Sequence, residues 1–361
     1  MYHYWACCDC LCETPPEELG TLLQNSDPEA SNLIRKDWLK TLAKYRAPSY
    51  PRSLFELGVT GLPFVALWGA AWWALSISYW LAFGISLAAG LFLLRLFLIQ
   101  HDCGHGAFFR TKWANDWVGR TLGVFTLTPY DVWARSHAIH HGTAGNLSKR
   151  GTGDVDTLTV REYLALPKRR QVLYRLYRHP LVMFGLGPAY IYFVRNRLPL
   201  GFMRSGSRYW ISAMGTNVVT ALLVALAIYA VGAGPFLLVY LPTTLLAASI
   251  GVWLFYVQHQ FEDTFWAEAE NWSLNDAALT GSSHLDLPPA LRWITANIGI
   301  HHVHHFSSRI PYYRLPAVLR DYPELANVRR LTFLQSFGCL KLRLWDEQKQ
   351  RLVPFSALRT T

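Results

Sequence analysis

Histidines are the residues of this sequence whose type and spacing point most directly to chemistry. Of the 13 histidines, eight form three clusters and a ninth, His259, stands alone between the second and third clusters. Within a cluster the spacings are i, i+3 and i+4, which place side chains on one face of a helix. Imidazole is a good ligand for zinc, iron, copper and nickel. The pattern predicts a metal site formed by His101, His105, His137, His140, His141, His259, His301, His304 and His305.

The number and type of these ligands favour two redox-active ions. Eight or nine imidazoles exceed the needs of one ion, so two metals are the economical interpretation. The sequence has no His-Glu-x-x-His segment, in which a zinc peptidase carries its general base. Two iron ions that bind and reduce O2 fit this ligand set better. We expect no catalytic side chain separate from the metal ligands.

Other polar residues near the clusters are candidates to orient the ligands, because ligating imidazoles need carboxylate or carbonyl partners. The nearby acidic residues are Asp102, Asp116, Asp131, Asp154, Asp156, Glu262 and Asp263. Each of them, taken alone, is equally an ordinary cap or ion-pair residue. Asn297, four residues before His301, is a candidate to hold a metal-bound water or to cap a helix. The residues predicted to surround and orient the metal ligands are Asp102, Asp156, Asn297 and His302.

The elements that must position these histidines are indicated by where charge is missing. The chain is 52% hydrophobic and only 16% charged, against about 25% charged in a soluble domain. Residues 57–94 and 209–261 contain no Asp, Glu, Lys or Arg, and about 20 apolar residues suffice for one membrane-spanning helix. Each stretch therefore predicts a helical hairpin. Soluble enzymes, nucleic-acid binders and disordered proteins are excluded on this basis.

The predicted architecture is an all-α membrane protein with four transmembrane helices, in two hairpins, capped by a cytoplasmic helical domain that holds the metal site. The predicted spans are 55–75, 79–99, 212–231 and 236–257. We divide the chain into an N-terminal cytoplasmic segment, 1–53, and a membrane enzyme domain, 54–361. The cytoplasmic parts of that domain are 100–210 and 258–361.

The basic residues orient these spans. The formal net charge is +10, and 33 of the 34 Lys and Arg residues fall in segments on one side of the predicted spans. By the positive-inside rule both termini and the central segment are cytoplasmic. The exception, Arg95, is expected to snorkel from a helix end. All nine histidines then lie on the same side of the membrane. A metal transporter would place its ligands near the bilayer midplane, whereas the predicted spans contain no histidine.

Three further segments carry expectations. Residues 30–46 are predicted to form an amphipathic helix, on the membrane surface or against the cytoplasmic domain. Residues 179–194 are apolar but too short to span, so we expect an interfacial or re-entrant segment. Four of the six cysteines lie between Cys7 and Cys12, and a metal site, palmitoylation and a tail of unknown use all remain open for them. No signal peptide is expected.

The three clusters resemble the histidine boxes of the integral-membrane fatty acid desaturases, specifically the bacterial and cyanobacterial omega-6 (delta-12) acyl-lipid branch. His101 and His105 match the short first box, as HDCGH. The second and third clusters match the HxxHH boxes, and Trp133 before the second box is also in pattern. His259 resembles the additional ligand between boxes two and three. The resemblance covers residues 35–345.

The resemblance implies a di-iron oxidoreductase that uses O2 to introduce a cis double bond into a membrane lipid acyl chain. Ferredoxin or a similar carrier is the implied electron donor, because the sequence carries no flavin, Rossmann or haem motif, and no nucleic-acid partner is expected. The implied location is the bacterial inner membrane. A delta-9 desaturase and a di-iron hydroxylase or ketolase of a lipid or carotenoid are the alternatives.

Overall fold

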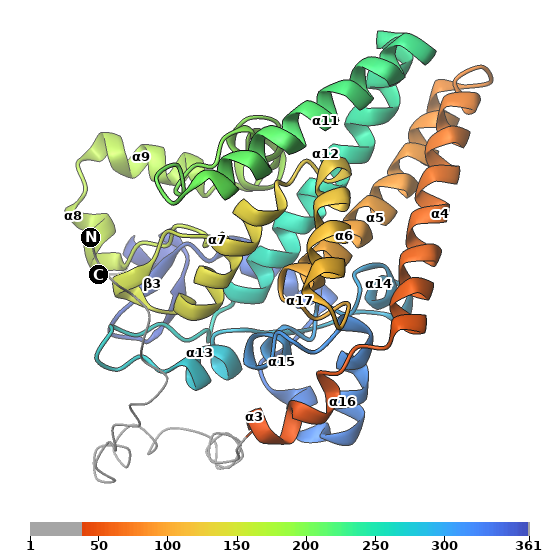
Figure 1. The fold of residues 1–361 in the computed structure, drawn as a ribbon. Helices are drawn as coiled ribbons and strands as arrows, with labels where there is room; N and C mark the ends of the chain where they lie inside the picture. Colours follow the sequence, from red (N-terminus) through yellow and green to blue (C-terminus); the bar gives the residue numbers. More distant parts are fainter. Residues whose placement is uncertain (1–37, 360–361) are drawn as a thin grey trace. The chain divides into compact units, whose positions relative to one another are not determined.

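Four long helices dominate the structure, a computed structural model that describes residues 38–359. They are α4 (Tyr50–Ala74), α5 (Tyr79–Gly104), α11 (Ser207–Val231) and α12 (Ala233–His259). Each is long and apolar enough to cross a membrane, since 25 residues rise about 38 Å and the hydrocarbon core is about 30 Å thick. α4 and α5 form one hairpin, α11 and α12 form the other, and α5 packs along α12 (Figure 1). The four predicted helices and their pairing are confirmed.

The helix ends differ from the prediction on the side that carries the histidines. α4 and α11 begin five residues earlier than expected, and α5 and α12 continue to Gly104 and His259. His101 and His259 therefore lie in the last turns of spanning helices. The sequence had suggested instead that they lie just after these helices. Apolar composition marks the hydrocarbon region, whereas backbone hydrogen bonds carry the helix beyond it.

The turn of the second hairpin depends on a glycine. Gly232 joins α11 to α12 with a φ of +86°, a backbone conformation that residues with a Cβ rarely adopt. Its amide N–H donates to the carbonyl of Ile228, which caps α11. This is the tight connection that the Gly-Ala-Gly-Pro sequence predicted.

Shorter elements make up the rest of the described chain. The helices are α3 (Trp38–Thr41), α6 (Lys112–Phe125), α7 (Tyr130–Thr143), α8 (Val160–Ala165), α9 (Lys168–Tyr177), α10 (Gly187–Phe193), α13 (Leu274–Thr280), α14 (Pro289–Ile294), α15 (His301–Phe306), α16 (Leu315–Asp321) and α17 (Phe333–Ser336). The short 3₁₀ helices are η2 (Leu42–Tyr45), η3 (Leu147–Lys149), η5 (Arg195–Arg197), η6 (Tyr312–Arg314), η7 (Pro323–Asn327), η8 (Gly338–Lys341) and η9 (Phe355–Arg359). η4 (Val182–Leu186) is a π-helical turn.

Two small sheets accompany these helices. β1 (His284–Asp286) pairs with β2 (Arg330–Thr332) in parallel, and β3 (Leu344–Asp346) pairs with β4 (Arg351–Val353) in antiparallel fashion. The second sheet packs through Leu344 and Val353 on Tyr163 and Tyr174 of α8 and α9. The central polar segment and the C-terminal segment thus share one apolar core.

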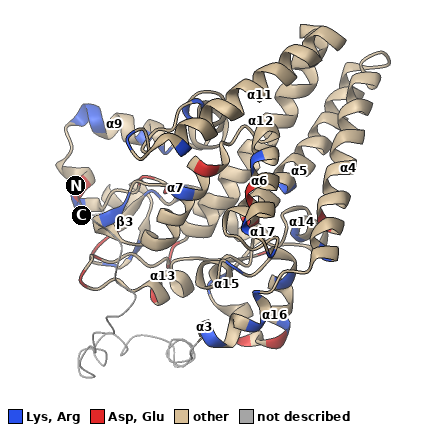
Figure 2. Cartoon of the chain, viewed as in Figure 1, with Lys and Arg blue, Asp and Glu red and all other residues tan. Residues whose placement is uncertain are grey.

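Charged residues gather at one end of the four long helices. Figure 2 shows no Lys, Arg, Asp or Glu on the ends of these helices furthest from α15. The expectation for Arg95 was wrong. Its side chain is 1% exposed and does not snorkel, because the Glu56 carboxylate on the neighbouring helix α4 neutralises it inside the protein.

The remaining segment predictions have mixed outcomes. Of residues 30–46, the part before Trp38 lies outside the described residues, as does the Cys7–Cys12 cluster; the rest forms the short helix α3 followed by η2. Residues 179–194 form η4 and α10, which pack on α12. They are not among the helices long enough to span a membrane in the part of the chain that the structure describes.

Candidate metal site

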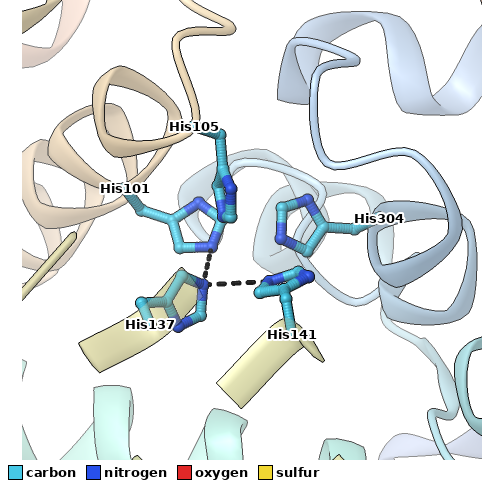
Figure 3. A group of neighbouring side chains, drawn as sticks. All are labelled: His101, His105, His137, His141 and His304. Carbon is cyan, nitrogen blue, oxygen red and sulfur yellow. Dashed lines mark hydrogen bonds between the residues drawn. The ribbon is translucent and has the colours of Figure 1, made fainter. Parts of the chain in front are cut away.

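Five histidines converge at the C-terminal end of α5. Each residue of this five-histidine group offers one ring nitrogen, and these five atoms all lie within 4.8 Å of one another. Figure 3 shows the imidazoles of the group pointing toward one another from α5, α7 and α15. The Nε2 of His137 is 3.0 Å from that of His101 and 3.1 Å from that of His141. The group consists of His101, His105, His137, His141 and His304.

Four other histidines form a second group beside the first. One ring nitrogen from each of them lies within 4.8 Å of the other three, and all four residues are buried. The Nε2 of His259 is 3.1 Å from that of His140 and 3.0 Å from that of His301. The rings of His141 and His305 stack at a centroid distance of 4.0 Å, which joins the two groups. This four-histidine group consists of His140, His259, His301 and His305.

Helical spacing explains how each HxxHH cluster serves both groups. His137 and His141 are one turn apart on α7 and point to the five-histidine group, while His140 points to the other. On α15, His301 and His305 are one turn apart in the four-histidine group. The structure therefore brings together all nine histidines singled out in the sequence and divides them as five and four.

Hydrogen bonds orient two rings of the four-histidine group so that their Nε2 atoms face the other ligands. The Nδ1 of His259 donates to the Gly281 carbonyl over 3.2 Å, and the Nδ1 of His140 donates to the Asp154 carboxylate. An imidazole with its proton on Nδ1 has a lone pair on Nε2. Ligating histidines typically hold their second ring nitrogen in this way. The rings are thus prepared to coordinate.

The buried ring nitrogens fit a cation better than they fit one another. A neutral imidazole nitrogen either donates or accepts, so the Nε2 atoms of His137 and His259 cannot satisfy both of their close neighbours. The Nε2 atoms of His105, His304 and His305 are buried without any hydrogen-bond partner. Unpaired buried polar atoms are costly. A metal ion in each group would satisfy these lone pairs at once, and all-imidazole donor sets suit iron, zinc or copper.

Burial keeps five of the histidines outside the spanning helices uncharged. Burial, together with repulsion between neighbouring imidazoles, holds the pKa of His137, His141 and His304 well below the ordinary value. The same causes lower the pKa of His301 and His305. A neutral imidazole is the form that coordinates a metal. The site is therefore ready for metal at neutral pH.

The four residues predicted to surround the ligands occupy different places. Asp102 lies beside the ligands: its Oδ1 is 3.3 Å from the Nδ1 of His101. His302 is buried but faces away, and its Nε2 donates to the Leu325 carbonyl. Asn297 donates to the Tyr312 carbonyl over 3.2 Å. Asp156 is exposed, and its hydrogen bonds run through its backbone.

Two contacts to the histidines were not predicted from the sequence. Asp154, not Asp156, reaches His140, although both stood among the candidate carboxylates. The glycines at 151 and 153, both with positive φ, were the signal available for a tight loop that turns Asp154 inward. The Gly281 carbonyl left no signal in the sequence, because any residue type can supply a backbone acceptor.

Trp133, which precedes the second cluster in the sequence, stacks on His137 with ring centroids 4.6 Å apart.

An apolar cavity of about 350 Å³ borders both groups. Its inner wall includes His101, His137 and His301, and it is lined by residues of α5, α7, α10 and α12. Its size is at the lower end of the range for small-molecule sites. A small apolar ligand in this space would lie against the histidines.

Comparisons with known proteins agree with this geometry. The family model described as "Fatty acid desaturase" matches residues 78–336. A fatty acid desaturase of Bacillus subtilis (strain 168) is 43% identical over 90% of this chain and 92% of its own length. An sn-1 oleoyl-lipid 12-desaturase of Synechocystis sp. is 24% identical over 83% of this chain and 84% of its own. An sn-1 acyl-lipid omega-3 desaturase (ferredoxin) of Nostoc sp. is 28% identical over 65% and 66%.

Proposed function

The chain belongs to the fatty acid desaturase family, the oxidoreductases that desaturate fatty acyl chains, and from this premise we propose that it is an iron- and O2-dependent acyl-lipid desaturase of the delta-12 (omega-6) type. The observation that carries the proposal is the pair of buried histidine groups beside one apolar cavity. The net reaction is R–CH2–CH2–R + O2 + 2e⁻ + 2H⁺ → R–CH=CH–R + 2H2O.

Two iron ions are the proposed cofactors, one held by the five-histidine group and one by the four-histidine group. Bound iron would activate O2 so that an unactivated C–H bond can be broken. The protein holds the acyl chain: the lining of the cavity excludes water, and the walls from α5 and α12 bring two adjacent methylenes toward His101 and His301. Positioning of this kind removes much of the entropic cost of the reaction.

Asp102 and Asp154 are proposed to orient ligands. Asp154 fixes the tautomer of His140, and Asp102 lies against the Nδ1 of His101. Asp102 also accepts the backbone N–H of Tyr312 over 2.7 Å, which ties the end of α5 to the segment after α15. The first and third boxes are thereby held in register.

Ferredoxin or a similar carrier is the proposed electron donor. Two relatives named as acyl-lipid omega-3 desaturases carry the word ferredoxin in their names, and the sequence carries no motif for a flavin, dinucleotide or haem. The proposed location is the bacterial inner membrane with the histidine groups on the cytoplasmic side, supported by the 33 basic residues on that side of the helices.

The double-bond position is the finer part of the proposal. It is supported by relatives named as 12-desaturases at 24% and 25% identity, while the relative at 43% has no position in its name. The test is expression in a host with defined saturated and monounsaturated lipids, followed by fatty-acid profiling with location of double bonds. A new delta-12 diene supports the proposal. New monoenes indicate a delta-9 enzyme, and oxygenated products indicate a hydroxylase or ketolase.

A further inference from the structure

The segment 167–208, which we call the interfacial segment, has an unusual charge pattern. It contains nine Lys and Arg residues and no Asp or Glu. Large apolar side chains on α9, η4 and α10 point outward, among them Leu176, Leu181 and Leu186, which are 57% to 75% exposed. Exposed apolar residues among basic ones are typical of a segment at the surface of an anionic membrane. Figure 2 shows the basic residues on α9.

The interfacial segment is also one wall of the cavity. η4 and α10 pack on α12, and Met183, Gly187 and Ile191 line the cavity from this side. Further along, Arg195 and Leu198 line it as well, and both are exposed. The same cavity therefore reaches from the buried histidines to a stretch of chain at the membrane surface.

Arg195 is the one Lys or Arg among the residues that line this cavity. Its guanidinium has no hydrogen-bond or ion-pair partner within residues 38–359. Two other arginines of the interfacial segment have partners within the protein: Arg178 is buried and donates to Gln260, and the exposed Arg208 pairs with Asp131. Arg195 is thus an unpaired cation at the exposed part of a mostly apolar cavity.

We propose that Arg195 binds the phosphate of a membrane glycerophospholipid whose acyl chain occupies the cavity. A guanidinium donates two parallel hydrogen bonds to phosphate. The residues beside Arg195 favour a lipid in the bilayer over a soluble phosphate ester, because Val194, Leu198 and Leu200 are exposed and apolar. The acyl chain would then pass from the membrane directly between α10 and α12. This inference rests on the proposed function and names its substrate as a phospholipid.

The test measures binding to the purified full-length chain in non-ionic detergent micelles, which contain no phosphate. Three radiolabelled probes are compared by retention on the protein: dioleoyl phosphatidylglycerol, dioleoylglycerol and oleoyl-CoA. Arg195→Gln is expected to weaken phosphatidylglycerol binding about tenfold, the equivalent of one charged hydrogen bond. Dioleoylglycerol binding is expected to stay unchanged. Arg195→Lys is expected to retain part of the affinity.

Arg170→Gln is the matched control, because Arg170 is exposed on the same segment and does not line the cavity. It is expected to bind all three probes as the unchanged protein does. The inference is overturned if Arg195→Gln leaves phosphatidylglycerol binding intact or weakens both lipids equally. It is also overturned if oleoyl-CoA is the probe that depends on Arg195.

Turnover of the same probes separates this inference from the proposed function. If the unchanged protein desaturates no lipid while its phosphatidylglycerol binding depends on Arg195, the proposed function fails and the phosphate site stands. If both lipids are desaturated and Arg195→Gln changes neither binding nor KM, the phosphate site fails and the function stands. A rise in KM for phosphatidylglycerol alone, with kcat unchanged, supports both.

Discussion

The Glu56 carboxylate and the Arg95 guanidinium lie 2.5 Å apart between the spanning helices α4 and α5, each with a side chain at most 2% exposed. The same carboxylate accepts the hydroxyl of Tyr312 over 2.9 Å. The backbone N–H of Tyr312 in turn donates to Asp102, the neighbour of His101. Because a charge inside a membrane protein is costly unless it is paired, this ion pair fixes the loop after the third histidine box against the first.

Removal of one partner of this pair is expected to destabilise the protein strongly. Glu56→Ala leaves Arg95 as an uncompensated buried charge, at a cost of about 3 kcal/mol or more. Thermal unfolding in detergent measures the loss. Arg52→Ala is the matched control, because Arg52 also contacts Glu56 but is about half exposed, and its removal is expected to cost less than about 1 kcal/mol. Equal unfolding temperatures for Glu56→Ala and the unchanged protein would refute this interpretation.

Iron content should follow the division of the histidines into two groups. The purified protein is expected to hold two iron ions. His105→Ala and His141→Ala remove ligands of the five-histidine group, and His301→Ala removes one of the other; each variant is expected to lose at least one ion. His302→Gln is expected to retain both, because that ring faces Leu325. Elemental analysis decides, and stoichiometric zinc without iron would contradict the assignment.

Two acidic residues in one loop are expected to behave differently. Asp154→Asn weakens the hold on His140 and should lower metal affinity about tenfold to a hundredfold. Asp156→Asn is the control, since the Asp156 side chain is exposed. Metal retention during dialysis against a graded chelator measures the difference. Equal retention by the two variants would mean that the contact between Asp154 and His140 has no role in metal binding.

A glycine in the cavity offers a test of where the acyl chain lies. Gly251 lines the cavity from α12, and a Cβ there would meet Leu94 at 3.7 Å, an ordinary contact. Gly251→Ala is therefore expected to be tolerated. Gly251→Phe fills the cavity and should reduce desaturation of an 18-carbon chain at least about tenfold, since a displaced substrate loses its positioning, with iron content unchanged.

The control for Gly251→Phe is Gly234→Phe, on the same helix, where no atom lies within 4 Å of an added Cβ. Product formation is measured by gas chromatography of the extracted lipids. If Gly251→Phe desaturates the chain as well as Gly234→Phe does, the acyl chain does not occupy this cavity.

The sequence predicted the parts of the fold that depend on periodicity and composition. Long uncharged stretches indicated the four helices, and the i, i+3, i+4 spacing indicated which histidines would meet. The division into five and four was not predictable, because it depends on how α7 and α15 are rotated relative to each other. Gly281 was missed because its carbonyl is a backbone group.

Charge placement was less predictable than helix placement. Arg95 at a helix end favours snorkelling when it is considered alone; the structure pairs it with Glu56 on the adjacent helix, which only packing reveals. Asp154 and Asp156 could not be told apart by residue type, and the glycines at 151 and 153 were the one sign of a tight loop at Asp154. The direction in which each carboxylate points depends on the turn of the loop between them.

Acyl-lipid desaturation by this protein is best tested by the mass of the product formed from one defined lipid. The purified protein, loaded with iron and supplied with reduced ferredoxin and O2, is incubated with dioleoyl phosphatidylglycerol and the acyl chains are analysed by mass spectrometry. We expect an oleoyl chain to lose two hydrogens and gain a cis double bond, and His141→Ala to abolish this change. A chain that gains oxygen, or one that stays unchanged with an enzyme that holds two iron ions, would contradict it.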